Sequence, residues 1–276
     1  MKNIEIAKDA AELSQLLARD GCGLYTSSLS GLSLQALQPI IDTFMDLINL
    51  PKEERAEWEI DADGEDNPDD GLVERFGGGY DHKFFFHFKS MERIMHTMSG
   101  KQSYANQRDK WDKFLMGLEM IHARLCQDLL QVISAFDGLY PGHDMLEKIK
   151  QRNYQTRGII RLLYYKPGHA VTAKPHYDQS LLTAHVAESR PGLIVGKENH
   201  EAGIVYVPDN RNMLVFPGIK ADIATDNVMQ AMYHVAVADE TKIDEGRWAI
   251  IFFYNCEVPF TTKELSAKIQ EKLAKA

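Results

Sequence analysis

The chain has 276 residues, of which 44% are hydrophobic and 26% are charged, and its formal net charge is −9. This length and composition indicate a globular chain with enough apolar material for one large domain or two small ones, and they exclude a disordered one. The acidic balance lacks the basic surface that phosphate neutralisation requires, so nucleic acid is not expected as a partner.

The cysteines and the N-terminal residues indicate the compartment. Cys22, Cys126 and Cys256 form no C-x-x-C pair, which argues against a disulfide framework or a thiolate metal site. The opening residues lack the apolar stretch of a signal peptide, and no run of 18 apolar residues occurs. These features predict a cytoplasmic protein that has no membrane segment.

Residues 1–150 are expected to form a mostly helical N-terminal region. After a short strand at residues 4–6, apolar residues at steps of three and four predict helices over 10–20, 37–50 and 109–139. Gly21 is expected to end the first of these helices, and Pro51 the second.

From Gly158 the pattern changes to short β-branched or aromatic runs that Gly, Pro, Asn or Asp separate. At least seven such strands over residues 151–260 predict a barrel or jelly-roll core. Residues 261–276 are expected to form a C-terminal helix, which opens with Thr261 and Glu264 at capping-box spacing. The predicted fold class is therefore α+β, with N-terminal helices packed around a jelly roll.

An acidic stretch at residues 59–71 raises the question of a calcium loop. An EF-hand loop that began at Asp61 would need glycine at its sixth position and glutamate at its twelfth, where this chain has Asp66 and Leu72. The motif is absent, and a solvated loop is predicted instead.

The segment KPHYDQSLLTAH, residues 174–185, contains the strongest chemical signal. His176 and Asp178 stand two positions apart in a strand-like run, so their side chains would share a face and could bind one ion. His234, in a later strand-like run, is the best third ligand. Two imidazoles and one carboxylate form the facial triad of non-haem Fe(II) sites, which leaves three coordination positions open. Strand alternation would turn His185 away, so it is not included.

Arg247 starts the next strand-like run after His234, beyond a polar hairpin. An antiparallel strand that returned past His234 would bring Arg247 into the same cavity. Its planar guanidinium would suit a ligand's carboxylate, and the alternative is a structural ion pair with an acid of the chain. Tyr165, on the strand before the metal strand, would add a phenolic hydrogen bond.

At these residues the sequence resembles the isopenicillin N synthase-like Fe(II)/2-oxoglutarate-dependent oxygenases, which fold as a double-stranded β-helix. The similarity lies in FMDLINLPKEER, YDHKFFFHF, RLLYYKP, PHYDQSLLT and PGLIV, and so extends through most of the chain. By this resemblance His176, Asp178 and His234 would bind Fe(II). Arg247 and Tyr165 would hold the distal carboxylate of 2-oxoglutarate.

The resemblance implies an enzyme that uses Fe(II), O2 and 2-oxoglutarate, with ascorbate as a supporting reductant, to hydroxylate or desaturate a small molecule. Succinate and CO2 would be released. The chain departs from the family pattern at Leu163, where asparagine is usual, at Ala249, where serine follows the arginine, and in a longer spacing from His234 to Arg247. Two alternatives stay open: an iron oxidase of the same family that uses no oxoacid, and a non-catalytic, cupin-like metal-binding module.

Overall fold

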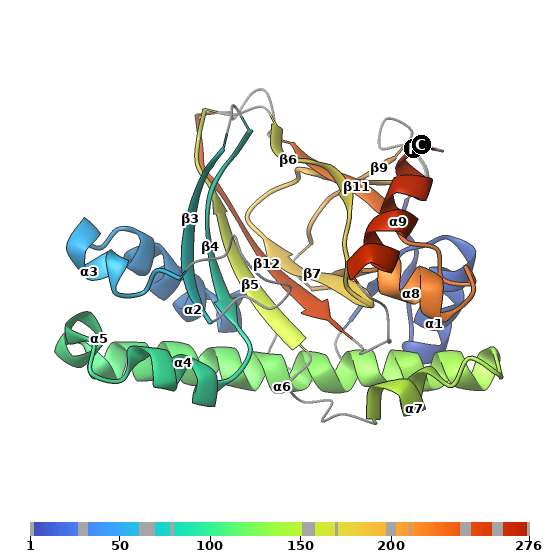
Figure 1. Ribbon diagram of the computed structural model, residues 1–276, viewed down its shortest axis with the longest axis horizontal. Helices are drawn as coiled ribbons and strands as arrows, with labels where there is room; N and C mark the ends of the chain where they lie inside the picture. Colours follow the sequence, from blue (N-terminus) through green and yellow to red (C-terminus); the bar gives the residue numbers. More distant parts are fainter. Residues whose placement is uncertain are drawn as a thin grey trace.

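The computed structural model in Figure 1 describes residues 3–26, 33–60, 70–77, 80–150, 158–168, 171–196, 203–209, 211–237, 244–255 and 262–274. The strands within this part of the chain are β1 (Ile6–Ala7), β2 (Gly23–Tyr25), β3 (Gly71–Gly77), β4 (Tyr80–Phe88), β5 (Gly158–Tyr165), β6 (Val171–Tyr177), β7 (Leu182–Glu188), β8 (Leu193–Gly196), β9 (Ile204–Tyr206), β10 (Met213–Pro217), β11 (Tyr233–Val237) and β12 (Arg247–Tyr254). The helices are α1 (Ala10–Arg19), α2 (Leu34–Ile48), α3 (Lys52–Ala56), α4 (Met91–Met98), α5 (Gln102–Asn106), α6 (Arg108–Leu139), α7 (Met145–Lys150), α8 (Ile219–Ala224) and α9 (Thr262–Leu273).

These strands form two sheets, one large and one small. The larger has eight strands in the order β1-β2-β10-β7-β12-β5-β4-β3, and the smaller has four in the order β6-β11-β8-β9. Apart from the parallel pair β1 and β2, neighbouring strands are antiparallel. Figure 1 shows β6 and β11 of the small sheet standing across from β4, β5 and β12 of the large one.

The large sheet has one face toward the helices and one toward the small sheet. On β4, Phe84, Phe86 and Phe88 join the core that the helices cover, whereas Phe85 points the other way. This division follows from the alternation of side chains along a strand. The long helix α6 runs beneath the strands in Figure 1, and its apolar residues, spaced by three and four, pack into the same core.

Most elements expected from the sequence are present. The predicted helices over 10–20, 37–50 and 109–139 correspond to α1, α2 and α6. Gly21, with a φ of 79°, follows α1 and donates its N–H to the carbonyl of Leu16, as a terminating glycine does. All seven strand-like runs after Gly158 are strands.

The N-terminal region supplies more strands than the one expected at residues 4–6. β1 to β4 come from residues before 150 and join the same sheet as β5, β7, β10 and β12, so the large sheet includes strands from both sides of that position. The acidic residues 61–69 and the cap residue Thr261 lie outside the described residues. Among the helices described, none is both long enough and apolar enough to cross a membrane.

Candidate active site

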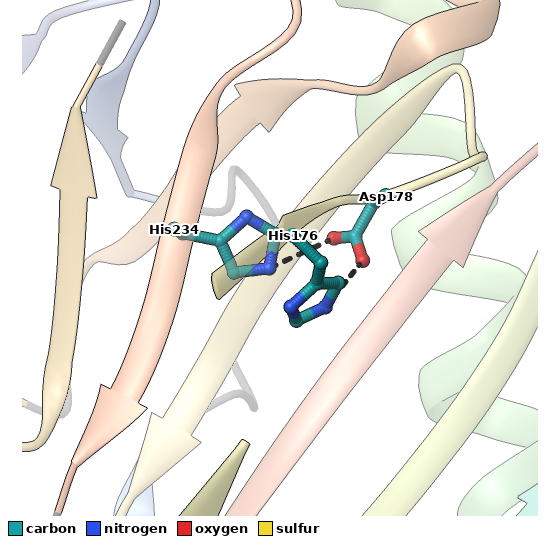
Figure 2. Close-up of side chains that lie close together, drawn as sticks. All are labelled: His176, Asp178 and His234. Atoms are coloured by element: carbon teal, nitrogen blue, oxygen red, sulfur yellow. Dashed lines mark ion pairs between the residues drawn. The ribbon is translucent and has the colours of Figure 1, made fainter. Parts of the chain in front are cut away.

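Three metal-competent side chains converge on the small sheet. His176 lies on β6 and pairs directly with His234 on the neighbouring strand β11, while Asp178 follows β6 at once. One ligand atom of each residue lies within 4.8 Å of the others. Asp178 Oδ1 is 3.5 Å from His176 Nε2, and its Oδ2 is 3.6 Å from His234 Nε2. Dashed lines in Figure 2 mark these two contacts. The structure thus brings together the three residues that the sequence proposes as ligands.

The backbone orients both imidazoles. Nδ1 of His176 is 2.6 Å from the carbonyl oxygen of Lys174, and Nδ1 of His234 is 3.1 Å from that of Met232. Because a carbonyl only accepts, each Nδ1 must carry the proton and donate it. In the neutral imidazole each Nε2 then has the lone pair, and it faces Asp178, which is the arrangement found in metal-binding histidines.

Hydrogen bonds to its side chain and to its backbone hold Asp178 in place. Thr183 donates its hydroxyl to Oδ2 at 2.7 Å, and the Asp178 carbonyl accepts from the amide of Ile219 at 2.8 Å. Gly218 makes this approach possible, because a Cβ there would lie 2.8 Å from the Asp178 carbonyl oxygen and 2.2 Å from that of Ser180. A larger residue at this position would displace the loop that positions the carboxylate.

The protonation states suit a divalent cation. Burial lowers the pKa of His234 to about 4, although Asp178 opposes the shift. Burial alone would raise the pKa of Asp178, but the two histidines hold that pKa well below its ordinary value. Burial would lower the pKa of His176, but the hydrogen bond with Asp178, the negative charge of Asp178 and the carbonyl of Lys174 together raise it. At neutral pH the carboxylate is therefore ionised and His234 is neutral, as a metal site requires.

The three residues lie on the wall of a cavity to which both sheets contribute. Besides them, the polar lining residues are Lys83, Arg161, Tyr165, His185 and Arg247. The apolar lining residues are Leu163, Ala173, Leu193, Ala236, Ala249, Ile251 and Phe253. A small ligand in this cavity would contact the candidate metal ligands and basic side chains together.

Arg247 lines the cavity as expected, but a carboxylate of the chain already contacts it. Its Nη2 is 2.5 Å from Oε2 of Glu188, and its guanidinium lies 5.4 Å from the centre of the Tyr165 ring. Nη1 is buried and has no hydrogen-bond partner among the described residues. The Nη1 amino group of Arg247, with its two N–H donors, therefore remains for a ligand oxygen.

Glu188 is the residue that the sequence reasoning missed. It is fully buried on β7 and binds Arg247 on one side and Nδ1 of His185 on the other. Burial would raise the pKa of Glu188, but Arg247 and His185 lower it, so the side chain is ionised. A signal was present, because Glu188 is the single acid of the strand LTAHVAE, and an acid must find a cation if it is buried.

Two geometric expectations from the sequence were wrong. β12, which carries Arg247, does not pair with the strand of His234. It lies between β5 and β7 in the other sheet, and Arg247 reaches the cavity from the opposite side. His185 was expected to point away, yet it lines the cavity. Alternation relates side chains only within one strand, and His185 lies on β7, in a different sheet from His176.

The two residues that depart from the family pattern are neighbours in space. Leu163 on β5 pairs with Ala249 on β12, and both line the cavity. The wall beside Arg247 is therefore apolar at the two positions where an amide and a hydroxyl would otherwise be available to a ligand.

Solved structures that are described as oxygenases, some of them as Fe(II)/2-oxoglutarate oxygenases, are similar in fold to this chain. A Shewanella oneidensis protein described as an oxygenase is similar, with a TM-score of 0.72, 16% identity and 100% of both chains covered. A 2OG-Fe(II) oxygenase family protein from Caulobacter crescentus is similar, with a TM-score of 0.68, 17% identity and 99% and 98% of the two chains covered.

A further similar structure contains a bound oxoacid. A full-length Neurospora crassa protein in complex with α-ketoglutarate and 5-formyluracil has a TM-score of 0.64 and 16% identity, and the match covers 96% of this chain and 89% of that one. No protein-family profile and no curated protein sequence matches the chain. The likeness is therefore one of fold rather than of close sequence.

Proposed function

We propose that this protein is an Fe(II)- and 2-oxoglutarate-dependent oxygenase that hydroxylates or desaturates a small molecule and releases succinate and CO2. In this proposal the two facing sheets are a double-stranded β-helix. The observation that carries it is the convergence of His176, Asp178 and His234, with both Nε2 lone pairs available, on a cavity that also contains Arg247.

The donor set fits Fe(II). Two neutral imidazoles and one carboxylate on one side of an ion leave positions open for an oxoacid and dioxygen, and bound iron would supply the oxidising chemistry. Asp178, whose carboxylate is ionised, would contribute the one negative charge among these three ligands. Tyr165 and the Nη1 group of Arg247 would bind the distal carboxylate of 2-oxoglutarate and so orient its keto acid end toward the triad.

The similar structures support the same ligand chemistry. The Neurospora crassa protein binds α-ketoglutarate together with 5-formyluracil. The dioxygenase for auxin oxidation 1 from Arabidopsis thaliana forms a binary complex with 2-oxoglutarate. By analogy of fold, the cavity of this chain would hold 2-oxoglutarate beside a small organic substrate.

The alternative of a purely structural metal site is less well supported. Structural zinc sites are closed by four protein ligands, whereas the candidate cluster within the described residues has three. An oxidase that uses no oxoacid would share the triad and leave Arg247 to its substrate. The ion pair between Arg247 and Glu188 is compatible with that second alternative.

Titration of 2-oxoglutarate into the anaerobic Fe(II) protein tests the proposal. Chelation of iron by an oxoacid should produce a metal-to-ligand charge-transfer band, and admission of O2 should then yield succinate. Iron binding without such a band would favour the oxidase if the protein still consumes O2 with a substrate, and the metal-binding module if it shows no turnover.

A further inference from the structure

The C-terminal helix α9 packs on the outer face of the small sheet, behind the candidate metal ligands. Side chains alternate along a strand, so Tyr177 and Tyr233 point away from the cavity that His176 and His234 line. The two tyrosines pair across β6 and β11, and their ring centres are 5.0 Å apart. Leu265 of α9 joins Tyr177 in a buried apolar cluster, and Tyr233 packs against that cluster.

The other buried members of this cluster are connected to the metal ligands through the backbone. Ile219 donates its amide N–H to the carbonyl of Asp178 at 2.8 Å. Ala231 immediately precedes Met232, whose carbonyl oxygen accepts a hydrogen bond from Nδ1 of His234. The cluster that α9 completes therefore adjoins all three candidate ligands.

A buried carboxylate connects α9 to the same backbone supports. Asp222 on α8 is 0% exposed, and its Oδ2 accepts from the amide of Ala231 at 2.9 Å. Nζ of Lys272 lies 2.6 Å from Oδ2, and Nζ of Lys268 lies 3.7 Å from Oδ1. In the part of the chain that the structure describes, both cations that pair with Asp222 belong to α9, which Figure 1 shows beside α8. Because a buried carboxylate needs a cation, the position of α8 depends on α9.

Lys272 is the closer of these two cations, and it also contacts the strand of the metal ligands. Its Nζ lies 5.6 Å from the centre of the Tyr177 ring, on the residue that precedes Asp178. Lys268 has a further partner, because its Nζ is 3.1 Å from Oδ1 of Asn227. Lys272 is therefore the side chain of α9 that contacts both α8 and β6.

We propose that α9 is a clamp for the metal site: the ion pair between Lys272 and Asp222 and the packing of Leu265 hold the three candidate ligands close enough together to bind one ion. This inference rests on the proposed function, which assigns an ion to the His-Asp-His triad. A clamp of this kind increases metal affinity because the ligands are ordered before the metal binds. Lys272 and Asp222 would be positioning residues, since neither lines the cavity.

The zinc affinity of the full-length protein tests the clamp without turnover. The dissociation constant is measured by competition with a chelator, and His176→Ala reports any binding elsewhere. Lys272→Met, which keeps the apolar stem but removes the charge, should weaken zinc binding at least about five-fold, the lower end of typical coupling between sites. Lys272→Arg should keep most of the affinity. Lys263→Met is the matched control and should bind zinc normally, because Lys263 is exposed on the same helix.

A double-variant cycle tests whether the ion pair is responsible. Asp222→Asn removes the charge and keeps an oxygen for the amide of Ala231, so it should weaken zinc binding as Lys272→Met does. The double variant should be little worse than either single variant, because both changes remove the same contact. Far-ultraviolet circular dichroism at the temperature of the titration checks that each variant is folded.

Hydrogen exchange measures the reverse effect. Coupling between two sites is reciprocal, so metal binding should strengthen the docking of α9 by the same factor. Zn(II) should therefore slow the exchange of the α9 amides in the natural sequence, much less in Lys272→Met, and not at all in His176→Ala. A helix with a purely structural role would change stability but show neither effect of zinc.

Equal zinc affinity in the natural sequence, Lys272→Met and Asp222→Asn would overturn the clamp. Exchange of the α9 amides that zinc leaves unchanged would also overturn it, as would equal weakening in Lys263→Met. Failure of the proposed function would appear separately: zinc affinity that depends on α9, without a charge-transfer band in the Fe(II) protein, would leave the clamp standing. Absence of zinc binding in the natural sequence would overturn both.

Discussion

The three candidate ligands differ in what holds each of them in place. His234 is buried and paired with Met232, whereas 45% of the His176 side chain is exposed and its orientation depends on Lys174 and Asp178. The sheet itself is held by backbone hydrogen bonds and apolar contacts rather than by these side chains. Loss of one ligand should therefore affect the metal before it affects the fold.

His176→Ala and Asp178→Ala should each lose most Fe(II), by roughly ten-fold to a hundred-fold or more in affinity, and should lose all turnover. Far-ultraviolet circular dichroism should remain unchanged. The measurement is metal content after dialysis against a defined Fe(II) concentration, with the exposed His96 as the site of a control substitution, His96→Ala. Stoichiometric iron together with activity in either triad variant would show that the ligands are wrongly assigned.

Substitutions of Glu188 and of Arg247 should have opposite effects on the binding of 2-oxoglutarate. Arg247→Leu should raise the concentration of 2-oxoglutarate needed for half-saturation about ten-fold or more, because a charge-assisted hydrogen bond is lost. Glu188→Gln should lower that concentration, because the charge of Arg247 is then no longer offset within the protein. Both are measured by anaerobic titration of the charge-transfer band, and iron content should hardly change.

A double variant separates the loss of 2-oxoglutarate binding from a loss of protein stability. Removal of one member of a buried ion pair typically costs about 3–5 kcal/mol, so Arg247→Leu is best compared with the double variant Arg247→Leu/Glu188→Gln, in which no charge is left unpaired. If both raise the 2-oxoglutarate requirement equally, lost binding rather than misfolding is the cause. A requirement unchanged in the double variant would move the carboxylate anchor to another residue.

Among the secondary-structure elements, α6 and β5 are joined by a buried histidine. Nε2 of His122 on α6 is 2.8 Å from the carbonyl oxygen of Gly158, the first residue of β5. Burial lowers the pKa of His122, and the hydrogen bond to Gly158 only partly opposes this shift. The helix therefore contacts the sheet through a histidine that is neutral in the folded protein.

This histidine should make stability depend on pH. As pH falls below about 6.5, the unfolded chain binds a proton at His122 that the folded chain does not, so the free energy of unfolding decreases, by at most about 1.4 kcal/mol per pH unit. Urea unfolding of the metal-free protein at pH 7 and pH 5 should show a smaller loss in His122→Gln than in the natural sequence. His96→Gln, on the exposed part of α4, should leave the loss unchanged; an equal loss in all three proteins would contradict the assignment.

For the molecule as a whole, the cavity lies between two sheets that carry different parts of the proposed site. The candidate metal ligands belong to β6, the loop after it and β11, and the proposed carboxylate anchor belongs to β12 of the large sheet. A metal alone would link strands of one sheet. A metal with 2-oxoglutarate would link the two sheets. Each ligand would bind the folded protein and so stabilise it against unfolding.

Metal and oxoacid should therefore raise the melting temperature in two steps. A ligand at a hundred times its Kd stabilises by about 2.7 kcal/mol, which corresponds to several degrees for a chain of this size. Differential scanning fluorimetry with Zn(II), followed by 2-oxoglutarate, should show both increments. Addition of 2-oxoglutarate without metal should raise the melting temperature much less. An equal rise without metal would show that the oxoacid does not bind through the ion.

The sequence by itself determined the kinds of element and the chemistry available to them. Apolar residues at steps of three and four define α6. His176 and Asp178 stand two positions apart, and alternation along a strand therefore puts their side chains on one face. Both patterns are local, because they depend on the geometry of a single helix or strand. The neighbouring strands of His234 and His176 were also predicted correctly, because His234 lies in a strand-like run far enough along the chain from Asp178 to return beside it.

Only the tertiary structure decided which strands are neighbours, and with them the partners of the charged residues. It placed β12 between β5 and β7, gave Arg247 a buried partner in Glu188, and brought Arg161 to His87. Strand order depends on how both faces of each sheet are covered by the rest of the chain. Local periodicity contains no information about that order, and a buried charge takes its partner from whichever strand packs beside it.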